Sequence, residues 1–307
     1  MEFVMLVGIP GSGKSSACRQ YAQAGYRIHS SDALREAMFG SEDVQRDPNL
    51  VFEHLLRDLR RDLEAGVSCV MDATNLSRKR RISTLNALPK GVEQKTCVLV
   101  LTSPDECRRR NSQRRRKVPE EVIHRMLCSF EAPYDYEGWD RIVPFVSGEE
   151  YRFPREEAML FSQDNPFHSL TLGAHLEAAR EYCRVHSFSD AVREAAWYHD
   201  TGKLYTKRFA NRRGEPTEIA HYYGHENYSA YLYLCEKAPA AAEAGTWADT
   251  LYIANLINWH MRPLVQWGQS PKTEERDRLL LGEKMYEEIL QLHQADVAAH
   301  GGEKTDE

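Results

Sequence analysis

The chain has little that would tie it to a membrane or to an oxidising compartment. Its seven cysteines make an odd count and form no Cys-X-X-Cys pair, which argues against a disulfide framework and against a cysteine zinc site. No run of residues is long and apolar enough to span a bilayer, and the first residues lack the charged-then-apolar layout of a signal peptide. We therefore expect a cytoplasmic protein with no membrane partner and with reduced, mostly buried thiols.

Length and composition predict about two domains. The chain has 307 residues, of which 42% are hydrophobic, and a formal net charge of −6. A chain of this length can bury two separate cores. We place the first domain at residues 1–150, the second at residues 151–300, and a disordered tail at residues 301–307.

A glycine-rich segment, Gly8-Ile9-Pro10-Gly11-Ser12-Gly13-Lys14-Ser15, follows the apolar run of residues 3–7. Its spacing is that of a P-loop between a buried strand and a helix, and a chance glycine-rich turn is a much weaker explanation. Backbone N–H groups would surround the β- and γ-phosphates, Lys14 would add a positive charge, and the Ser15 hydroxyl would hold Mg²⁺. The residues expected to bind ATP or another nucleoside triphosphate here are Gly11, Ser12, Gly13, Lys14, Ser15 and Ser16.

Strand and helix patterns alternate as far as about residue 145. Apolar strands are predicted at residues 3–7, 27–30, 67–72 and 95–101, with helices at residues 14–24 and 51–64. Parallel strands joined by helical crossovers form a sheet covered on both faces, and ligands bind at the carboxyl ends of its strands. The first domain is therefore expected to be an α/β P-loop domain in which Asp32, Asp72 and the P-loop meet in one crevice.

Two basic runs interrupt an otherwise acidic chain. Seven of the ten residues from 108 to 117 are Arg or Lys, and Arg78-Lys79-Arg80-Arg81 adds four more. Such runs are usually solvated helix faces, but beside a P-loop they more often meet phosphates. We interpret them as surfaces for a polyanionic substrate.

Three ordered motifs resemble those of the P-loop polynucleotide 5′-kinase family over residues 1–147. They are Ser31-Asp32-Ala33-Leu34-Arg35, Met71-Asp72-Ala73-Thr74-Asn75-Leu76, and Arg110-Asn111-Ser112-Gln113-Arg114 followed by Val118-Pro119. The resemblance implies transfer of the γ-phosphate of ATP to a 5′-hydroxyl end. It makes Asp32 the general base on that hydroxyl, and it makes Arg35 the ligand of the phosphate beside the acceptor nucleotide. Arg110 and Arg114 would belong to a lid over the triphosphate.

Other roles stay open for several of these residues. Asp32 could instead cap the helix that follows it. Asp72 could contact Mg²⁺ or substrate, or it could be a satisfied polar group at a strand end. The choice of Arg114 over its neighbours Arg115, Arg116 and Lys117 depends only on its offset from Arg110.

From residue 170 onward the sequence predicts helices only. Helical spacing covers residues 170–186, 190–198, 226–236, 249–260 and 279–298. Nine of the twelve histidines lie in the second half of the chain, from residue 168 onward. An all-α domain rich in histidine is therefore expected, and its histidines need an explanation.

The segment His199-Asp200-Thr201-Gly202-Lys203 ends one of the predicted helices, with Gly202 as the expected helix terminator. Adjacent residues at a helix end can bind one ion if other helices bring further ligands, and His175 and Asp296 would complete such a set. This arrangement resembles the HD superfamily of metal-dependent phosphohydrolases over residues 165–300. On that resemblance His225 and His260 would bind a second ion.

The number of metals and several side-chain roles stay open here. We favour two divalent transition metals over one, chosen from Mn, Fe, Ni, Co and Zn, although any one histidine could be a hydrogen-bonded core residue. Lys203 is expected to contact a phosphate, and the alternative is a plain surface lysine. Five histidines stay unassigned, with His221 and His293 expected close to the ligands; the five are His168, His186, His221, His293 and His300.

The two resemblances together imply repair of nucleic-acid ends, RNA in particular. A kinase would phosphorylate a 5′-hydroxyl end, and an HD phosphohydrolase would remove a 2′,3′-cyclic or 2′-phosphate at a 3′ end. Kinase–HD fusions of this kind are a bacterial family of RNA repair enzymes, and a nucleic-acid ligase would act downstream. Two other functions stay open, namely a nucleoside or small-molecule kinase joined to an HD nucleotidase, and an ATP-binding switch with a sensing HD domain.

Overall fold

The computed structural model describes residues 1–41 and 47–301. Contacts divide the chain into two compact units, one comprising Met1–Met126 and Pro133–Glu150, the other comprising Leu127–Ala132 and the chain from Tyr151 onward. In the described part of the chain, no helix is long and apolar enough to cross a membrane. Of the tail expected to be disordered, all but the first residue lies outside the described residues. All seven cysteines are free thiols, and six of them are buried.

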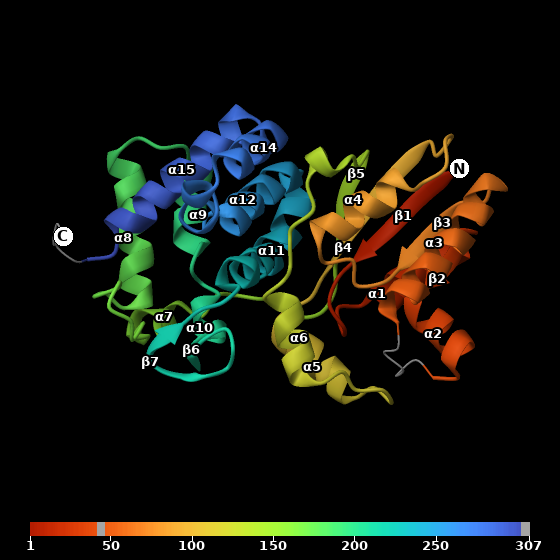
Figure 1. Ribbon diagram of the computed structural model, residues 1–307, viewed down its shortest axis with the longest axis horizontal. Helices are drawn as coiled ribbons and strands as arrows, with labels where there is room; N and C mark the ends of the chain where they lie inside the picture. Colours follow the sequence, from red (N-terminus) through yellow and green to blue (C-terminus); the bar gives the residue numbers. More distant parts are fainter. Residues whose placement is uncertain (42–46, 302–307) are drawn as a thin grey trace. The chain divides into compact units, whose positions relative to one another are not determined.

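The first unit is built on a five-stranded sheet with the order β2-β3-β1-β4-β5. Its strands are β1 (Glu2–Val7), β2 (Arg27–Ser30), β3 (Cys69–Asp72), β4 (Gln94–Leu101) and β5 (Arg141–Val146) (Figure 1). Every pairing is parallel. This order places the carboxyl ends of β2, β3 and β1 beside one another at a single edge of the sheet, which is where ligands bind in such folds.

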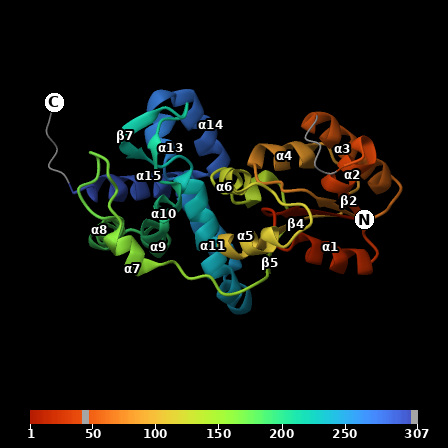
Figure 2. The same cartoon turned by 90° about the horizontal axis from the view of Figure 1, so that it is seen from below.

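Helices cover both faces of this sheet, as Figure 2 shows for α1 on one side and α3 and α4 on the other. The helices of the unit are α1 (Lys14–Gln23), α2 (Ser31–Phe39), α3 (Pro48–Glu64), α4 (Arg78–Asn86), α5 (Pro104–Ser112) and α6 (Glu120–Leu127), with a short 3₁₀ turn η1 (Asp135–Glu137). Helix α3 shows why the chain folds this way, because Val51, Leu55, Leu59 and Leu63 recur at helical spacing and are all buried. The α/β prediction for this half of the chain is confirmed.

The second unit is largely helical. Its helices are α7 (Arg155–Leu160), α8 (Leu172–Val185), α9 (Asp190–Tyr198), α10 (Lys203–Thr206), α11 (His225–Ala244), α12 (Trp247–Trp259), α13 (Arg262–Val265), α14 (Pro271–Leu281) and α15 (Glu283–Ala298), with a 3₁₀ turn η2 (Trp267–Gln269). Helix α8 packs against α9 and α15, and α12 packs against α9, α11 and α15. These helices enclose a core of apolar side chains, which includes Leu176, Leu232 and Ile289.

Two details of the predicted helices are wrong. The segment between α10 and α11 forms an antiparallel hairpin of β6 (Arg208–Ala210) and β7 (Pro216–His221) rather than helix. Its turn is fixed by the Asn211 side chain, which accepts hydrogen bonds from the backbone of Arg213 and Glu215. The helix predicted at residues 279–298 is broken at Gly282, whose φ of +78° and ψ of 157° are not helical.

Candidate active sites

The glycine-rich loop after β1 has the backbone that a P-loop requires. Gly11 has a φ of +84° and Gly13 a φ of +102°, values that favour glycine. A Cβ on Gly11 would overlap the carbonyl oxygen of Cys107, and a Cβ on Gly13 would lie 2.6 Å from Ser147 Oγ. Helix α1 begins at Lys14, directly after the loop, so its unpaired N–H groups and its dipole favour an anion there.

Lys14 bends back over this loop. Its Nζ donates hydrogen bonds of 2.9 Å to the carbonyl oxygens of both Gly8 and Ile9. Burial lowers the pKa of Lys14, while the nearby Asp72 and Asp32 carboxylates oppose that shift. The ammonium is therefore positioned where phosphate oxygens could replace these carbonyl partners. Ser15, the expected Mg²⁺ ligand, is exposed, and Ser16 follows it in the first turn of α1.

The loop forms one wall of a cavity of about 890 Å³ in the first unit. Asp32 and Arg35 of α2 and Asp72 at the end of β3 also line this cavity. Parallel strands explain the meeting, because β2 and β3 are neighbours in the sheet and their carboxyl ends lie at the same edge. The cavity thus brings a phosphate-binding loop, two carboxylates and several cations together.

Asp32 is not a helix cap. Helix α2 begins at Ser31, and Asp32 lies in its first turn, where its carboxylate accepts a 2.6 Å hydrogen bond from Arg35. A second cation, Arg116, lies 3.3 Å from the same oxygen. The Asp32 side chain keeps 46% of its surface exposed, so it can still meet a substrate hydroxyl.

The basic stretch after α5 supplies several cations to this cavity. Arg114, Arg116 and Lys117 line it, whereas Arg115 does not line it in the described part of the chain. Arg110 also lines the cavity, where its side chain donates hydrogen bonds of 3.0 Å to Ser147 Oγ and 3.4 Å to the Gly11 carbonyl. The offset from Arg110 therefore does not separate Arg114 from Arg116, which is the residue that pairs with Asp32.

The other basic run is partly structural, which corrects the interpretation that it meets phosphates. Arg81 is fully buried, and its Nε and Nη2 atoms donate to Glu137 at 2.7 and 2.5 Å. Arg80 does line the cavity, where its guanidinium lies 4.3 Å from the centre of the Phe52 ring. A helix places successive side chains on different faces, so adjacent arginines in this run have different surroundings.

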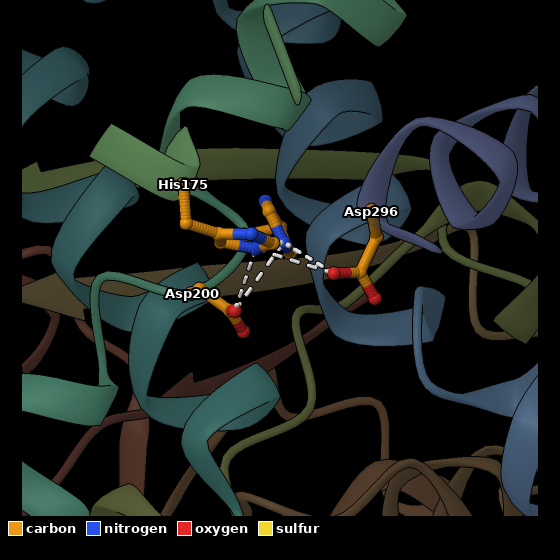
Figure 3. A group of neighbouring side chains, drawn as sticks. His175, Asp200 and Asp296 are labelled. Atoms are coloured by element: carbon orange, nitrogen blue, oxygen red, sulfur yellow. Dashed lines mark hydrogen bonds and ion pairs between the residues drawn. The ribbon is translucent and has the colours of Figure 1, made fainter. Parts of the chain in front are cut away.

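In the second unit, the six predicted ligands gather into two overlapping groups of buried side chains. His175, His199, Asp200 and Asp296 form one group, and Asp200, His225 and His260 form the other. His175 and Asp296 lie on α8 and α15, His199 and Asp200 follow α9, His225 begins α11, and His260 follows α12. Figure 3 shows His175, Asp200 and Asp296 pointing toward one another. Five helices therefore bring the ligands to one place.

Asp200 belongs to both groups because its two carboxylate oxygens face different histidines. Oδ2 lies 3.2 Å from His175 Nε2 and 3.4 Å from His199 Nε2. Oδ1 lies 3.0 Å from His225 Nε2 and 3.7 Å from His260 Nε2. A carboxylate in this position can share its oxygens between two cations.

All four histidines are held in the same way by the backbone. Their Nδ1 atoms lie 2.7 to 3.0 Å from main-chain carbonyl oxygens, those of Ala299, Ala196, Tyr222 and Ile257. A carbonyl can only accept a hydrogen bond, so each Nδ1 carries a proton, and each ring presents an Nε2 lone pair whenever it is neutral. Such backbone bonds orient metal-ligating histidines and fix their tautomer.

These lone pairs face one another without a bridging donor. His175 Nε2 and His199 Nε2 are 3.2 Å apart, and His225 Nε2 and His260 Nε2 are 3.3 Å apart. Two lone pairs at this distance repel unless a proton or a metal ion lies between them. The buried Oδ2 of Asp200 also has no donor in hydrogen-bond geometry within the described chain, although Lys203 Nζ lies 2.6 Å away. The donor set therefore fits divalent metals with nitrogen and oxygen ligands.

Protonation states in this cluster follow from charge pairing against burial. Burial alone would lower the pKa of His175, but the nearby negative carboxylates of Asp200 and Asp296 raise it to about 9. Burial lowers the pKa of His260 to about 3, and the nearby His199 and His225 add to that shift. Burial would raise the pKa of Asp200, yet Lys203 and the histidines hold it well below its ordinary value. Burial would likewise raise the pKa of Asp296, yet nearby histidines hold it well below its ordinary value, so both aspartates are ionised.

Lys203 is not a surface lysine. It is only 5% exposed, and besides Asp200 its Nζ contacts Gln163 Oε1 at 3.0 Å and His168 Nε2 at 3.1 Å. A buried ammonium beside the cluster is suited to a substrate phosphate. Gly202 is not a helix terminator of the left-handed kind, since its φ is −64°.

Of the five unassigned histidines, two lie at the cluster without having been predicted there. His300 Nε2 is 3.4 Å from Asp296 Oδ1, and the His168 ring lies 5.0 Å from that of His175. The available signal was the four-residue interval from Asp296 to His300, a spacing that brings two side chains to the same side of a helical turn, although α15 itself ends at Ala298. His293 is near enough for the Asp296 charge to influence its pKa, which burial lowers. His221 instead stacks on Tyr223, and His186 stacks on Tyr182.

Comparison with known proteins agrees with the fold of the first unit. A family model described as an AAA domain matches residues 3–133. Among solved structures, a chain of the Pnkp1/Rnl/Hen1 RNA repair complex is 18% identical with a TM-score of 0.37, over 41% of this chain and 42% of that one. A gluconokinase from Sinorhizobium meliloti 1021 is 23% identical with a TM-score of 0.36, over 48% of this chain and 83% of that one. Shikimate kinase from Acinetobacter baumannii, in complex with shikimate, is 16% identical with a TM-score of 0.34, over 48% of this chain and 86% of that one.

The chain spans less than half the length of the repair-complex chain that it matches. Likenesses this distant carry no argument about substrate. Residues 3–133, which contain the P-loop, are similar to an AAA domain. A largely helical region with a buried histidine–aspartate cluster follows it.

Proposed function

We propose that the protein repairs nucleic-acid ends, RNA in particular, by means of a kinase site in the first unit and a metal-dependent phosphohydrolase site in the second. The observation that carries the proposal is the convergence of four Nε2 lone pairs and two carboxylates, with every Nδ1 tied to the backbone. A core histidine needs no such arrangement. A phosphohydrolase that uses two metals does.

At the kinase site, the loop residues from Gly11 to Ser16 bind ATP, and Ser15 holds Mg²⁺. Asp32 takes the proton from the acceptor 5′-hydroxyl, which suits a carboxylate that is still 46% exposed beside two arginines. Arg35 binds the phosphate next to the acceptor nucleotide. Arg110 and Arg114 stabilise charge on the transferring phosphoryl group.

At the phosphohydrolase site, His175, His199, Asp200 and Asp296 hold one divalent metal, and His225 and His260 with Asp200 hold a second. When bound, such ions supply Lewis acidity toward a phosphoester and lower the pKa of water. Lys203 neutralises charge on the substrate phosphate from its buried position beside Asp200. The substrate is a 2′,3′-cyclic or 2′-phosphate at an RNA 3′ end, and a nucleic-acid ligase would join the repaired ends.

A second candidate is a kinase for a nucleoside or another small hydroxyl compound. It is favoured by the apolar part of the cavity wall, where Val51, Phe52, Leu55 and Met126 could pack against a small acceptor. The many cations that line the same cavity favour a polyanionic polymer instead. They are Arg35, Arg80, Arg110, Arg114, Arg116, Arg125, Lys14 and Lys117.

One experiment separates these functions. The protein is incubated with labelled ATP and an RNA oligonucleotide that has a 5′-hydroxyl and a 2′,3′-cyclic phosphate, and both ends of the product are mapped. Lys14→Ala should abolish 5′ labelling and spare 3′ hydrolysis, with Lys90→Ala as a matched surface control. The double variant H199A/D200A should show the reverse and should lose the metal that elemental analysis finds in the wild type.

Labelling of nucleosides but not of RNA would overturn the repair function in favour of the small-molecule kinase. Retention of bound metal and of 3′ hydrolysis by the H199A/D200A protein would overturn the assignment of the second site. Loss of both activities in either variant would count against two separate sites.

A further inference from the structure

The β6–β7 hairpin is inserted between two parts of the histidine–aspartate cluster. Lys203, which contacts Asp200, lies five residues before β6, and the cluster residue His225 lies four residues after the end of β7. Figure 1 shows the hairpin between α10 and α11. Tyr223 is two residues from His225, so their Cα atoms are at most roughly 7 Å apart. Whatever binds at the base of this hairpin is therefore close to the cluster.

The hairpin and the residues just after it carry a group of cationic and aromatic side chains around the Tyr223 ring, with Arg212 supplied by the turn. The His221 and Tyr223 rings are stacked, with centroids 5.4 Å apart and an angle of 9° between their planes. The guanidiniums of Arg208 and Arg212 lie 5.4 and 5.2 Å from the centre of the same Tyr223 ring. We call these four residues, Arg208, Arg212, His221 and Tyr223, the hairpin face.

The arginines of the hairpin face have no ion-pair partner among the described residues. Both are exposed, and no carboxylate among the described residues forms an ion pair with either of them. Other exposed arginines of the second unit do have partners, such as Arg184 with Glu181 and Arg193 with Asp190. Two guanidiniums without counter-charges in a chain of net charge −6 form a local site for an anion.

We infer that the hairpin face binds the single-stranded end of a polynucleotide and leads it to the histidine–aspartate cluster. Guanidiniums beside aromatic rings are the combination that single-stranded nucleic acid favours, because arginines contact phosphates and rings stack on bases. An acidic peptide would use the charge but not the aromatic rings. The inference depends on the proposed function, since it names the surface that presents an RNA 3′ end to the second site.

The test measures binding and hydrolysis separately on the full-length chain. Binding is followed by fluorescence anisotropy with a twelve-residue oligouridylate that carries a 5′ fluorescein, which blocks phosphorylation, and a 2′,3′-cyclic phosphate. Hydrolysis is followed with uridine 2′,3′-cyclic monophosphate, a substrate that lacks the preceding nucleotides that the hairpin face is proposed to bind. The two readouts separate a failure of the surface from a failure of the catalytic site.

The R208Q/R212Q variant should bind the oligonucleotide about tenfold more weakly, and its plot of log affinity against log salt should be shallower by about 1.4, the value for two lost phosphate contacts on a single strand. Tyr223→Leu should weaken binding at least about fivefold, and Tyr223→Phe should bind like the wild type because the ring remains. The matched control R184Q/R193Q makes the same change in charge on α8 and α9. It should bind like the wild type, and all variants should hydrolyse the mononucleotide at the wild-type rate.

An unchanged affinity and salt slope in R208Q/R212Q would overturn the inference, and so would an equal loss in the control variant. Displacement of the oligonucleotide by poly-glutamate as readily as by unlabelled oligouridylate would also overturn it, in favour of an acidic peptide. If the wild type failed to hydrolyse the mononucleotide, the proposed phosphohydrolase would fail. A hairpin-dependent affinity in that same protein would still support the surface.

Discussion

Glu137→Gln should destabilise the first unit strongly, because it removes a carboxylate that pairs with the buried Arg81 guanidinium. The two side chains are 0% exposed and form a two-point contact at 2.5 and 2.7 Å. Arg81 Nη1 also donates to the carbonyls of Asn75 and Leu76 at 3.1 and 2.9 Å. These carbonyls lie in the segment just after β3, so the pair also fixes the backbone beside the nucleotide cavity.

The expected cost follows from leaving the buried Arg81 guanidinium without the negative charge of Glu137. Removal of one partner from a buried ion pair typically costs about 3–5 kcal/mol. For a domain of this size, each kcal/mol lowers the melting temperature by about 2–4 °C, so the unit should melt roughly 6–20 °C lower. Calorimetry and urea unfolding on the full-length protein measure this. The exposed pair between Arg108 and Glu120 gives the control, because Glu120→Gln should cost less than about 1 kcal/mol.

The alternative, taken from the sequence alone, is that Arg81 contacts substrate phosphate. In that case Glu137→Gln would leave the melting temperature near the wild-type value and would weaken phosphorylation of RNA. That result would refute the structural role argued here. An apolar double variant, R81M/E137L, gives a second check, since replacement of both charges should recover much of the stability that Glu137→Gln loses.

Three further outcomes are expected. Arg35→Ala should raise the KM for an RNA acceptor by about tenfold or more while the KM for ATP changes little. In the wild type, nucleoside 3′-monophosphates should be better acceptors than nucleosides. Equal effects of Arg35→Ala on the KM for RNA and the KM for ATP would contradict the role of Arg35. Burial would raise the pKa of Asp62, but the hydrogen bond from Arg27 holds it below its ordinary value of 3.8. Asp62→Asn should therefore lower the free energy of unfolding at pH 7. The difference in stability between this variant and the wild type should vanish in acid titrations, at pH values below 3.8. His225→Ala should reduce bound metal to about one ion per chain and slow hydrolysis, whereas His186→Ala, which changes a histidine away from the cluster, should do neither by elemental analysis and phosphate release.

Much of the fold could be predicted because local patterns determine it. The apolar run at residues 3–7 and the glycine spacing after it require a strand and a loop of left-handed glycines, whatever the rest of the chain does. The parallel sheet then follows from the helical crossovers, and it brings Asp32 and Asp72 to one edge. The meeting of His175, His199 and the other four ligands could be expected in the same way, from ordered positions on successive helices; metal binding by them stays a proposal.

The remaining features depend on tertiary packing, which a single sequence does not show. Arg81 and Lys203 each look like one more charged residue in a polar stretch, and only the folded chain shows that both are buried against carboxylates. The hairpin escaped prediction because β6 has three residues, which is too short for a period-2 pattern. His168 lies in a segment without regular structure, so helical spacing gave no reason to place it at the cluster.

The glycine of the His199-to-Lys203 segment has a different physical role from the one that its position suggests. Gly202 keeps a right-handed backbone, so it does not end a helix by a positive φ. A Cβ there would instead overlap the carbonyl oxygen of His225, and it would lie 2.9 Å from the backbone nitrogen of Ser229. The Gly202 N–H also donates a 2.8 Å hydrogen bond to Ser229 Oγ. This close approach joins the turn after α9 to the first turn of α11, and it is why Asp200 can reach His225 with one carboxylate oxygen while the other faces His175 and His199.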